Sequence, residues 1–374
     1  MSSFVVALDV GGTSMKGGLV ARSGEILRID RRATPRDRGP AAVVEEIRSF
    51  IGDLAAAGGG TPEGVGLAVP GLVTADTALY SANIGWRGVP AADFVPLDVP
   101  VMLGHDVRTG GLAESVLGAG RELSDFLFLP IGTGIAGAVI VNGEPYGGTA
   151  GWGGEIGHIP VFPQGEPCAC GQVGCLETYA SASAVARRYA ARLAAASSGN
   201  TATGTAFSPE TTVPAGTAAS SGTAAPAGTA VSSGTAAPAL TGTAAPTDEA
   251  VPPAPATAER IAALTAAGDP VARQVWDDAV EALSLALATY TLLLDPSAII
   301  LGGGLAEAGP LLSVPLTERL RNRLTFRDAP PLRQAALGVN AGMLGAALLG
   351  WRAAGFTDAG TEWSLDVLKS PRVA

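Results

Sequence analysis

Apolar and polar residues fall into blocks along the chain, and these blocks predict a mixed α/β protein. Short apolar runs that end in glycine or an acid indicate buried strands, and longer segments with apolar residues three and four positions apart indicate amphipathic helices. The predicted strands are 4–9, 17–21, 64–69, 99–104, 124–131, 138–143 and 297–301. The predicted helices are 40–57, 105–114, 179–196, 270–294, 305–327 and 341–353.

Two of the predicted strands lead into a glycine-rich turn that is followed by another strand. The first turn reads Asp9-Val-Gly-Gly-Thr-Ser-Met-Lys16, and the second reads Gly132-Thr-Gly-Ile-Ala-Gly137. The second turn matches the glycine spacing of a dinucleotide-binding fingerprint, but that fingerprint must open a helix, whereas a strand follows here. We therefore exclude a dinucleotide site. Two halves that open in the same way instead imply a duplicated, two-lobed fold.

Both turns have the chemistry of an anion site, because successive backbone N–H groups in a glycine-rich turn can point together at a phosphate. In the first turn, Asp9 could hold Mg²⁺ through water, and Thr13 and Lys16 could touch phosphate. An ordinary tight hairpin with an incidental acid is the alternative, and this stretch alone leaves both interpretations open. The chain has no P-loop pattern, so a nucleotide site here would be of another kind.

Three further positions have a functional and a plain structural interpretation. Asp106 stands where a predicted strand runs into a helix: it is either a helix N-cap or a general base at the carboxyl end of a parallel strand, where α/β proteins bind ligands. The glycines 302–304 either let a flat ligand lie against the backbone or form a plain strand-to-helix turn. Asn83 and Trp86 could line a pocket, although a lone tryptophan usually belongs to a core.

The densest chemistry lies in residues 148–180. This stretch contains all three cysteines of the chain and one of its two histidines: His158, Cys168, Cys170 and Cys175. Three thiolates and an imidazole form the tetrahedral set that suits structural zinc. Three unrelated buried cysteines are the alternative, and a disulfide with one thiol left over is a poor framework. The sequence therefore predicts a structural zinc site.

Composition and charge narrow the functional class. Of the 374 residues, 47% are hydrophobic and 16% are charged, which is typical of a globular chain with a full core. The formal net charge of -10 argues against nucleic acid as the main partner, because binding phosphates needs clustered Lys and Arg. Neither a signal peptide nor a membrane-spanning apolar run is visible, and cysteines are few, so we expect a cytoplasmic protein without a membrane partner.

One internal segment differs sharply in composition from the rest of the chain. Residues 197–257 are almost entirely Ala, Thr, Gly, Ser and Pro, with Phe207 as their single aromatic residue. Such a segment cannot bury enough apolar surface to offset the entropy of ordering it. We predict a disordered insertion at a surface loop, and a loose C-terminal tail over 360–374.

Taken together, these stretches resemble the ROK family of sugar kinases, which has the two-lobed hexokinase/actin-like ATPase fold of duplicated ribonuclease H-like lobes. The most specific matches are the first glycine turn, the strand–helix junction at Asp106, Gly154-Glu-Ile-Gly-His158 and the stretch from Cys168 to Glu177. The resemblance covers nearly the whole chain except the insertion and the tail. Many ROK members are repressors with an N-terminal DNA-binding module, which we expect this chain to lack.

The resemblance also implies how the chain is divided. It implies a small lobe of residues 1–118, completed by the C-terminal helix 338–356. It implies a large lobe formed by residues 119–196 and 258–337, which contains the zinc residues and the adenosine side of the site.

The activity that the resemblance implies is ATP-dependent phosphorylation of a hexose at O6, with glucose as the leading substrate and Asp106 as the general base. The implied sugar contacts are Asn83, His105, Asp106, Glu155, His158 and Glu177, and His158 would also bind zinc. The implied contacts to Mg²⁺ and phosphate are Asp9, Gly11, Gly12, Thr13, Lys16, Gly132, Thr133 and Gly134. The implied adenosine contacts are Gly302, Gly303 and Gly304, and family members are commonly homodimers.

One residue departs from the family pattern and leaves the sugar open. The family usually has asparagine immediately before the catalytic aspartate, and this chain has His105. The imidazole must contact the sugar differently, so N-acetylglucosamine or N-acetylmannosamine remains an alternative substrate and polyphosphate an alternative donor. A non-catalytic sugar sensor would leave the retained Asp106 unexplained, and a plain zinc-binding interaction module would leave both glycine turns unexplained.

Overall fold

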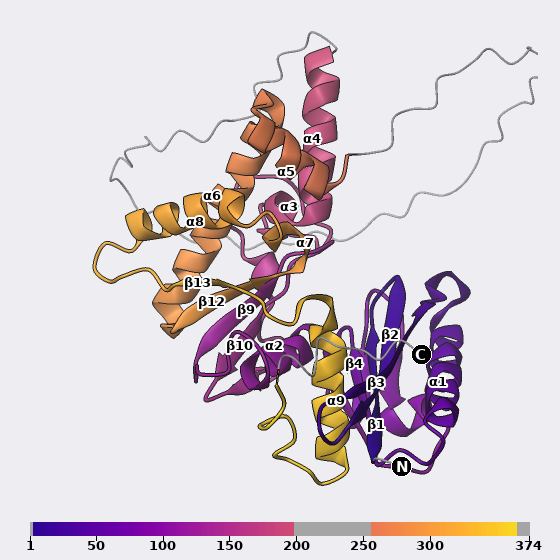
Figure 1. Ribbon diagram of the computed structural model, residues 1–374. Helices are drawn as coiled ribbons and strands as arrows, with labels where there is room; N and C mark the ends of the chain where they lie inside the picture. Colours follow the sequence, from indigo (N-terminus) through magenta and orange to yellow (C-terminus); the bar gives the residue numbers. More distant parts are fainter. Residues whose placement is uncertain (1–2, 198–255, 365–374) are drawn as a thin grey trace, which may run out of the picture. The chain divides into compact units, whose positions relative to one another are not determined.

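The computed structural model of the protein describes residues 3–197 and 256–364 (Figure 1). Nearly all of these residues belong to one compact unit, formed by residues 1–193 and 256–374. A second unit spans 194–255, of which only 194–197, the end of a helix, are described. The predicted disordered insertion therefore lies, apart from its ends, outside the described residues.

The first sheet has five strands in the order β3-β2-β1-β4-β8. Strand β1 pairs antiparallel with β2 and parallel with β4; β2 pairs antiparallel with β3, and β4 pairs parallel with β8. Helix α1 packs on one face of this sheet and helix α9 on the other. The bounds are β1 Phe4–Val10, β2 Ser14–Ala21, β3 Ile26–Ala33, β4 Val65–Val69, β8 Val101–His105, α1 Pro40–Ala57 and α9 Ala341–Ala353.

The second sheet repeats this plan in the order β11-β10-β9-β12-β13. Its central strand β9 again has an antiparallel neighbour, β10, and a parallel neighbour, β12. The outer strands extend the pattern, since β11 pairs antiparallel with β10 and β13 pairs parallel with β12. The duplicated fold expected from the two glycine turns is therefore confirmed. The bounds are β9 Phe126–Pro130, β10 Ala138–Val141, β11 Glu144–Tyr146, β12 Ala298–Gly302 and β13 Leu332–Gln334.

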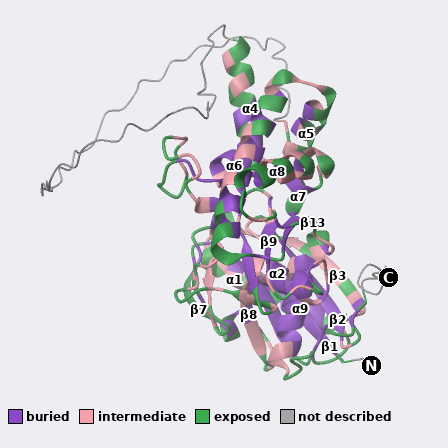
Figure 2. Ribbon diagram, turned by 90° about the vertical axis from the view of Figure 1, so that its left-hand side faces the viewer, coloured by how far each residue is buried: buried purple, intermediate pink, exposed green. Residues whose placement is uncertain are grey.

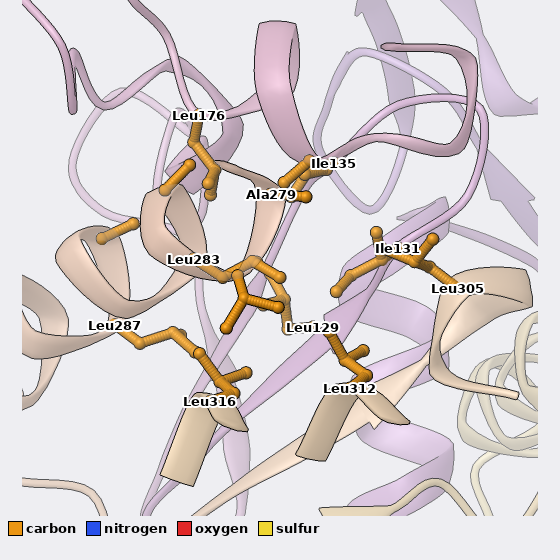
Figure 3. Close-up of a cluster of buried hydrophobic side chains, with 14 of the residues drawn as sticks. Leu129, Ile131, Ile135, Leu176, Ala279, Leu283, Leu287, Leu305, Leu312 and Leu316 are labelled. Carbon is orange, nitrogen blue, oxygen red and sulfur yellow. The ribbon is translucent and has the colours of Figure 1, made fainter. Parts of the chain in front are cut away.

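The largest buried cluster lies between the second sheet and the helices that cover it. In this cluster α6 presents its apolar side to β9 and to α8, and Figure 3 shows the side chains converging. Figure 2 shows the same concentration of buried residues in α6 and, for the first sheet, in α9. The cluster includes Leu129 and Ile131 at the end of β9, Leu283 and Leu287 of α6, and Leu312 and Leu316 of α8.

Helix α6 has the predicted bounds, Pro270–Leu294. It begins at Asp269, whose carboxylate accepts the backbone N–H of Ala272 at 2.7 Å, and Pro270 occupies the first turn.

The other helices are α2 Asp106–Val116, α3 Glu177–Ala180, α4 Ala182–Ser197, α5 Ala258–Ala267, α7 Gly303–Ala306 and α8 Pro310–Arg323. A small sheet contains β5 Leu72–Val73, β6 Thr77–Tyr80 and β7 Arg87–Pro90, and the short 3₁₀ turns are η1 Arg36–Arg38, η2 Ala91–Phe94, η3 Ile156–His158 and η4 Gly338–Asn340.

Three predicted segments need correction. The single helix expected over 179–196 is divided at Ser181, whose backbone is extended (φ -70°, ψ 155°), into the end of α3 and α4. The single helix expected over 305–327 is two helices, α7 and α8, because Gly309 turns the chain with a φ of 55° and Pro310 starts a new helix. The loose tail expected over 360–374 is wrong for its first residues. Trp363 is 3% exposed and its indole N–H donates to the carbonyl of Arg22 at 3.0 Å, so the chain is anchored to the first sheet's side at Trp363, while Thr361, Glu362 and Ser364 are exposed. The rest of that tail lies outside the described residues.

Within 3–197 and 256–364, no helix combines the length and the apolar character that crossing a membrane requires.

Candidate active site and metal cluster

The first glycine-rich turn joins β1 to β2 and has a fixed shape. The backbone N–H of Gly11 donates to the carbonyl of Ser14 at 3.0 Å, and a Cβ on Gly11 would lie only 2.8 Å from that oxygen. Thr34, at the end of β3, holds the turn from outside: its hydroxyl donates to Gly11 O at 2.7 Å and its N–H to Thr13 O at 3.0 Å. Gly12 has open space where a Cβ would point. The turn is therefore preformed around its glycines, as an anion cradle requires.

Asp9 is the acid at the end of β1, next to this turn. Burial and the nearby Asp106 carboxylate raise the pKa of Asp9 to about 7, and Lys16 opposes that rise. The first turn of α9 lies against Asp9, because a Cβ on Gly342 would overlap its carboxylate. Asp9 thus offers carboxylate oxygens, the donor type that Mg²⁺ prefers.

Lys16 contacts protein groups in this structure. Its ammonium group donates to Val339 O at 3.1 Å and to the side-chain oxygen of Asn340, both in the segment that precedes α9. Burial lowers the pKa of Lys16, Arg31 lowers it further, and Asp9 raises it. The phosphate role predicted for Lys16 requires this ammonium group to turn from the α9 segment towards the glycine turn.

Asp106 is the first residue of α2 and follows β8 directly. The N-cap of α2 is His105 rather than Asp106, because His105 Nδ1 accepts the backbone N–H of Arg108 at 3.5 Å. Asp106 Oδ1 instead accepts the N–H of Val107 at 2.7 Å, and the side chain stays 32% exposed. The capping interpretation of Asp106 is therefore wrong by one residue, and its carboxylate remains accessible at the end of a parallel strand, where ligands bind.

Burial raises the pKa of Asp106 to about 6, while the Val107 N–H and the Arg108 guanidinium oppose that rise. A carboxylate with this pKa is ionised at neutral pH yet more basic than an ordinary aspartate, which suits a general base. His105 Nδ1 lies 3.2 Å from Asp106 Oδ1. Burial lowers the pKa of His105 to about 4, Arg108 lowers it further and Glu155 raises it, so this imidazole is neutral at neutral pH.

The second glycine-rich turn joins β9 to β10 and is held by the segment that follows the cysteines. Glu177 Oε2 accepts the backbone N–H of Ile135 at 2.7 Å, and a Cβ on Gly134 would come within 2.6 Å of the same oxygen. The Ser183 hydroxyl donates to Thr133 O at 2.5 Å. The N–H of Ala182 donates to the carbonyl of Gly132 at 2.8 Å. The structure thus places Glu177 directly against this turn.

The three glycines after β12 differ in the space around them. Gly303 has a φ of 75°, and a Cβ there would lie 2.5 Å from the carbonyl of Ile131, so close packing against the end of β9 requires glycine. A Cβ on Gly302 would meet the ring of Phe128 at 3.1 Å. Gly304 has no neighbour within 4 Å of that position. Of the three predicted adenosine contacts, Gly304 is the one with open space for a ligand.

The predicted metal residues come together in space, and we call His158, Cys168, Cys170 and Cys175 the metal cluster. Their four potential ligand atoms all lie within 4.8 Å of one another. Cys170 Sγ and Cys175 Sγ are 3.7 Å apart, and Cys168 Sγ is 3.9 Å from His158 Nδ1. Tetrahedral zinc with Zn–S bonds of about 2.3 Å separates two sulfur ligands by about 3.8 Å. The cluster is therefore able to hold a four-coordinate metal ion.

The remaining predicted sugar contacts differ in position. Glu155 is half-buried and immediately precedes the η3 turn that contains His158, so it lies beside the metal cluster in the chain. Asn83 is exposed on the loop between β6 and β7. Trp86, from the same loop, is 2% exposed and packs edge-to-face on Phe94, so the core interpretation of this tryptophan is correct.

Sequence reasoning missed Arg108, which stands in the first turn of α2. Its Nη1 donates to the carbonyls of Gly151 at 2.8 Å and Gly153 at 3.3 Å, in the loop that leads to Glu155. Arg108 and His105 also line a cavity of about 570 Å³ beside that loop. The sequence offered two separate signals, a cation two residues after the candidate base and a glycine-rich run at 147–154, but nothing local that joins them.

Comparison with known proteins identifies a family over almost the whole chain. The model of the ROK family matches residues 5–352. A glucokinase from Halalkalibacterium halodurans is 29% identical over 357 residues, which cover 92% of this chain and 93% of that protein.

Solved structures agree with this match. The ROK hexokinase from Thermus thermophilus has a TM-score of 0.68 and 28% identity, covering 94% of this chain and 99% of that one. A ROK family glucokinase from Streptomyces griseus, solved in complex with glucose and AMPPNP, has a TM-score of 0.68 and 26% identity, covering 94% of this chain and 100% of that one.

Proposed function

The chain belongs to the ROK family, and on this premise we propose that it is an ATP-dependent sugar kinase that phosphorylates the O6 hydroxyl of a hexose, with glucose as the leading substrate. The observation that carries the proposal is the setting of Asp106. This accessible carboxylate, with its pKa raised by burial to about 6, stands at the carboxyl end of a parallel strand and close enough to Asp9 to raise the pKa of that residue. Glucokinases that match the chain over nearly its full length support glucose as the first substrate to test.

In the proposed reaction, the hexose hydroxyl oxygen attacks the γ-phosphorus of ATP. A bond forms between that oxygen and phosphorus, the bond to the β-phosphate oxygen breaks, and ADP leaves. Asp106 accepts the hydroxyl proton as the new bond forms. The two glycine-rich turns, with Gly11–Thr13 and Gly132–Gly134, position the phosphates, because phosphoryl transfer depends on alignment and charge stabilisation more than on covalent catalysis.

Glu155, His158 and Glu177 are the proposed contacts to the sugar ring. His158 Nδ1 faces the sulfur of Cys168, which leaves Nε2 as the nitrogen for a hydroxyl. Glu177 uses Oε2 for the turn at Ile135, so Oε1 is the oxygen that a hydroxyl would meet. His105 and Asn83 remain weaker proposed contacts, and Gly304 is the best placed of the three proposed adenosine glycines.

Two metals belong to the proposal. Asp9 is the residue that would hold Mg²⁺ through water, and the ion would neutralise phosphate charge when bound. The metal cluster would hold zinc, since its donor set and spacing fit tetrahedral Cys₃His coordination. The proposed role of zinc is to fix the backbone that presents Glu155, His158 and Glu177, rather than to take part in the reaction.

An ADP-release assay over a panel of sugars tests this function. Wild-type protein should release ADP with glucose or another hexose, and Asp106→Asn should lose that activity while it still binds the sugar. The panel should include N-acetylglucosamine and N-acetylmannosamine. If no sugar stimulates ADP release, or if Asp106→Asn keeps full activity, the proposal is wrong.

A further inference from the structure

Arg108 joins two segments whose relative position the proposed reaction must keep constant. One is the first turn of α2, which contains Asp106. The other is the loop 147–154, here called the acceptor loop, which leads directly into Glu155. Arg108 Nη1 donates to two carbonyls of this loop, at Gly151 and Gly153, and a Cβ on Gly147 would lie 3.5 Å from the same nitrogen.

The acceptor loop has few means of holding itself in place. It contains five glycines, at 147, 148, 151, 153 and 154, and a glycine-rich backbone loses the most conformational entropy when it is ordered. Its far end is fixed, because the N–H of Gly137 donates to Gly154 O at 2.7 Å. Its two ends are joined by the N–H of Gly153, which donates to Gly147 O at 2.8 Å. Arg108 adds a side-chain hydrogen bond that ties this loop to α2.

The charge of Arg108 also interacts with both acids, Asp106 and Glu155. Burial lowers the pKa of Arg108, while the carboxylates of Glu155 and then Asp106 raise it, so both lie within electrostatic reach of the guanidinium. Because a half-buried cation attracts both carboxylates, it favours one distance between the two segments that contain them.

We propose that Arg108 is a positioning residue that sets the spacing between the general base Asp106 and the sugar-binding acid Glu155, by clamping the acceptor loop to the first turn of α2. This inference rests on the proposed sugar kinase function. In this assignment Arg108 acts on the protein backbone rather than on the phosphates or the reacting hydroxyl. It acts through the carbonyls of Gly151 and Gly153. Holding these two residues fixes the position of the backbone that leads into Glu155.

The charged and titratable groups around Asp106 come from four elements. Asp9 faces it from β1, His105 from β8, Arg108 from α2, and Glu155 acts on the same group of side chains from the end of the acceptor loop. Of these, Arg108 is the cation that favours the ionised form of Asp106. Removing its charge should therefore shift the acid limb of the rate profile to higher pH, in addition to loosening the loop.

Two substitutions separate the geometric and the electrostatic effect. Arg108→Met removes both the charge and the hydrogen bonds, and it should raise the hexose KM about 10- to 100-fold and shift the acid limb of kcat/KM to higher pH. Arg108→Lys keeps the charge but its shorter side chain cannot place an N–H donor where Nη1 reaches both carbonyls, so it should raise the hexose KM and leave the acid limb in place. Neither should change the KM for ATP.

The matched control is Arg352→Met. Arg352 lines the same cavity, but its guanidinium pairs with Glu144 at 2.7 and 3.0 Å instead of contacting the acceptor loop. This variant should keep the wild-type hexose KM and acid limb. If Arg108→Met keeps both wild-type values, or if the control shows the same losses, the assignment of Arg108 is overturned.

Amide hydrogen exchange gives a readout that does not depend on turnover. In Arg108→Met, exchange over 147–154 should quicken while exchange in α6 stays as in the wild type, which also verifies the fold. Unchanged exchange over the acceptor loop overturns the clamp even if a hexose is phosphorylated. If the wild type phosphorylates no sugar but the loop loosens in the variant, the proposed function fails and the clamp itself stands.

Discussion

Glu177 Oε2 accepts the backbone N–H of Ile135 at 2.7 Å, which ties the segment after the last cysteine of the metal cluster to the second glycine-rich turn. The sequence places Glu177 two residues after Cys175, and the resemblance to ROK kinases implied a sugar contact for it. The structure adds a second connection, since the same carboxylate braces the turn that would hold phosphate. Under the proposed function, the sugar side and the phosphate side of the site would therefore meet at Glu177.

We predict that Glu177→Ala weakens both substrates. The variant leaves the N–H of Ile135, a residue that is 3% exposed, without its carboxylate partner, and a lost charge-assisted hydrogen bond costs about 1.5–3 kcal/mol. The KM for ATP and the KM for hexose should each rise by about tenfold or more. Glu177→Gln is the control, because its amide oxygen can still accept from Ile135, and it should recover most of the ATP affinity. An ATP KM that is unchanged in Glu177→Ala would contradict the bracing role.

Turnover should depend on pH through Asp106. Burial raises the pKa of this residue to about 6 in the substrate-free protein, and a general base must be ionised, so kcat/KM should rise with pH through about 6. Asp106→Asn cannot accept the proton and should lower kcat by about 10²- to 10⁴-fold with little change in sugar binding. Steady-state rates from pH 5 to 9, with sugar binding measured by calorimetry, check both points. A flat profile across this range would remove Asp106 as the base.

The stability of the protein should also respond to pH through Asp9. Burial raises the pKa of Asp9 from 3.8 to about 7 in the folded protein. The folded state therefore holds this proton more tightly than the unfolded chain, and the contribution of Asp9 to stability falls as pH rises from about 4 through 7. Asp9→Asn, which cannot ionise, should melt at a higher temperature than the wild type at pH 8, and the difference should disappear near pH 4. Equal melting temperatures at pH 8 would contradict the raised pKa.

Loss of the metal should affect sugar affinity as well as stability. Purified protein should contain about one zinc per chain, because the cluster offers one Cys₃His set. Cys170→Ala removes one thiolate and should lower the zinc content, the melting temperature and the hexose affinity together, since Glu155 and Glu177 flank the cluster in the chain. Metal analysis and calorimetry measure the first and last of these. A folded, zinc-free variant with wild-type sugar affinity would make the metal purely structural.

Local signals explain what the sequence could predict. Helix α6 was predicted with its observed bounds because Pro270 starts it and an aspartate–proline pair follows its end. The metal cluster was predictable because cysteine and histidine are rare in this chain and lie close together in sequence. The duplicated sheets were predictable from two similar strand–turn–strand units. Each unit is a local pattern, formed by residues that are close together in the sequence.

The contacts that sequence reasoning missed join distant segments. Lys16 was predicted to touch phosphate, but its ammonium group contacts Asn340, which is 324 residues away. Arg108 contacts the acceptor loop 43 and 45 residues later. No local pattern encodes such pairs, because they depend on how α2 and α9 pack against the two sheets. The roles of the predicted sugar and phosphate residues remain proposals for the same reason.

Glu114 shows how two distant connections are joined, and it leads to a prediction about stability. This residue of α2 is fully buried, and its carboxylate accepts the N–H of Ala119 at 2.8 Å, of Ala336 at 3.1 Å and of Leu337 at 2.9 Å. Ala119 belongs to the connection from α2 to β9, and the other two belong to the connection from β13 to α9. One carboxylate therefore serves both passages of the chain between the first and second sheets.

Glu114→Gln replaces one of these acceptor oxygens with an NH₂ group that faces backbone donors. At least one buried N–H then loses its acceptor, at about 1–3 kcal/mol for each, so the free energy of unfolding should fall by at least about 1–3 kcal/mol. Glu122→Gln is the matched control, because Glu122 is an exposed acid in the same α2–β9 connection and should change stability by less than about 0.5 kcal/mol. Urea unfolding measures both variants. Equal midpoints for Glu114→Gln and the wild type would mean that the two connections are held by packing alone, with no net contribution from the buried carboxylate.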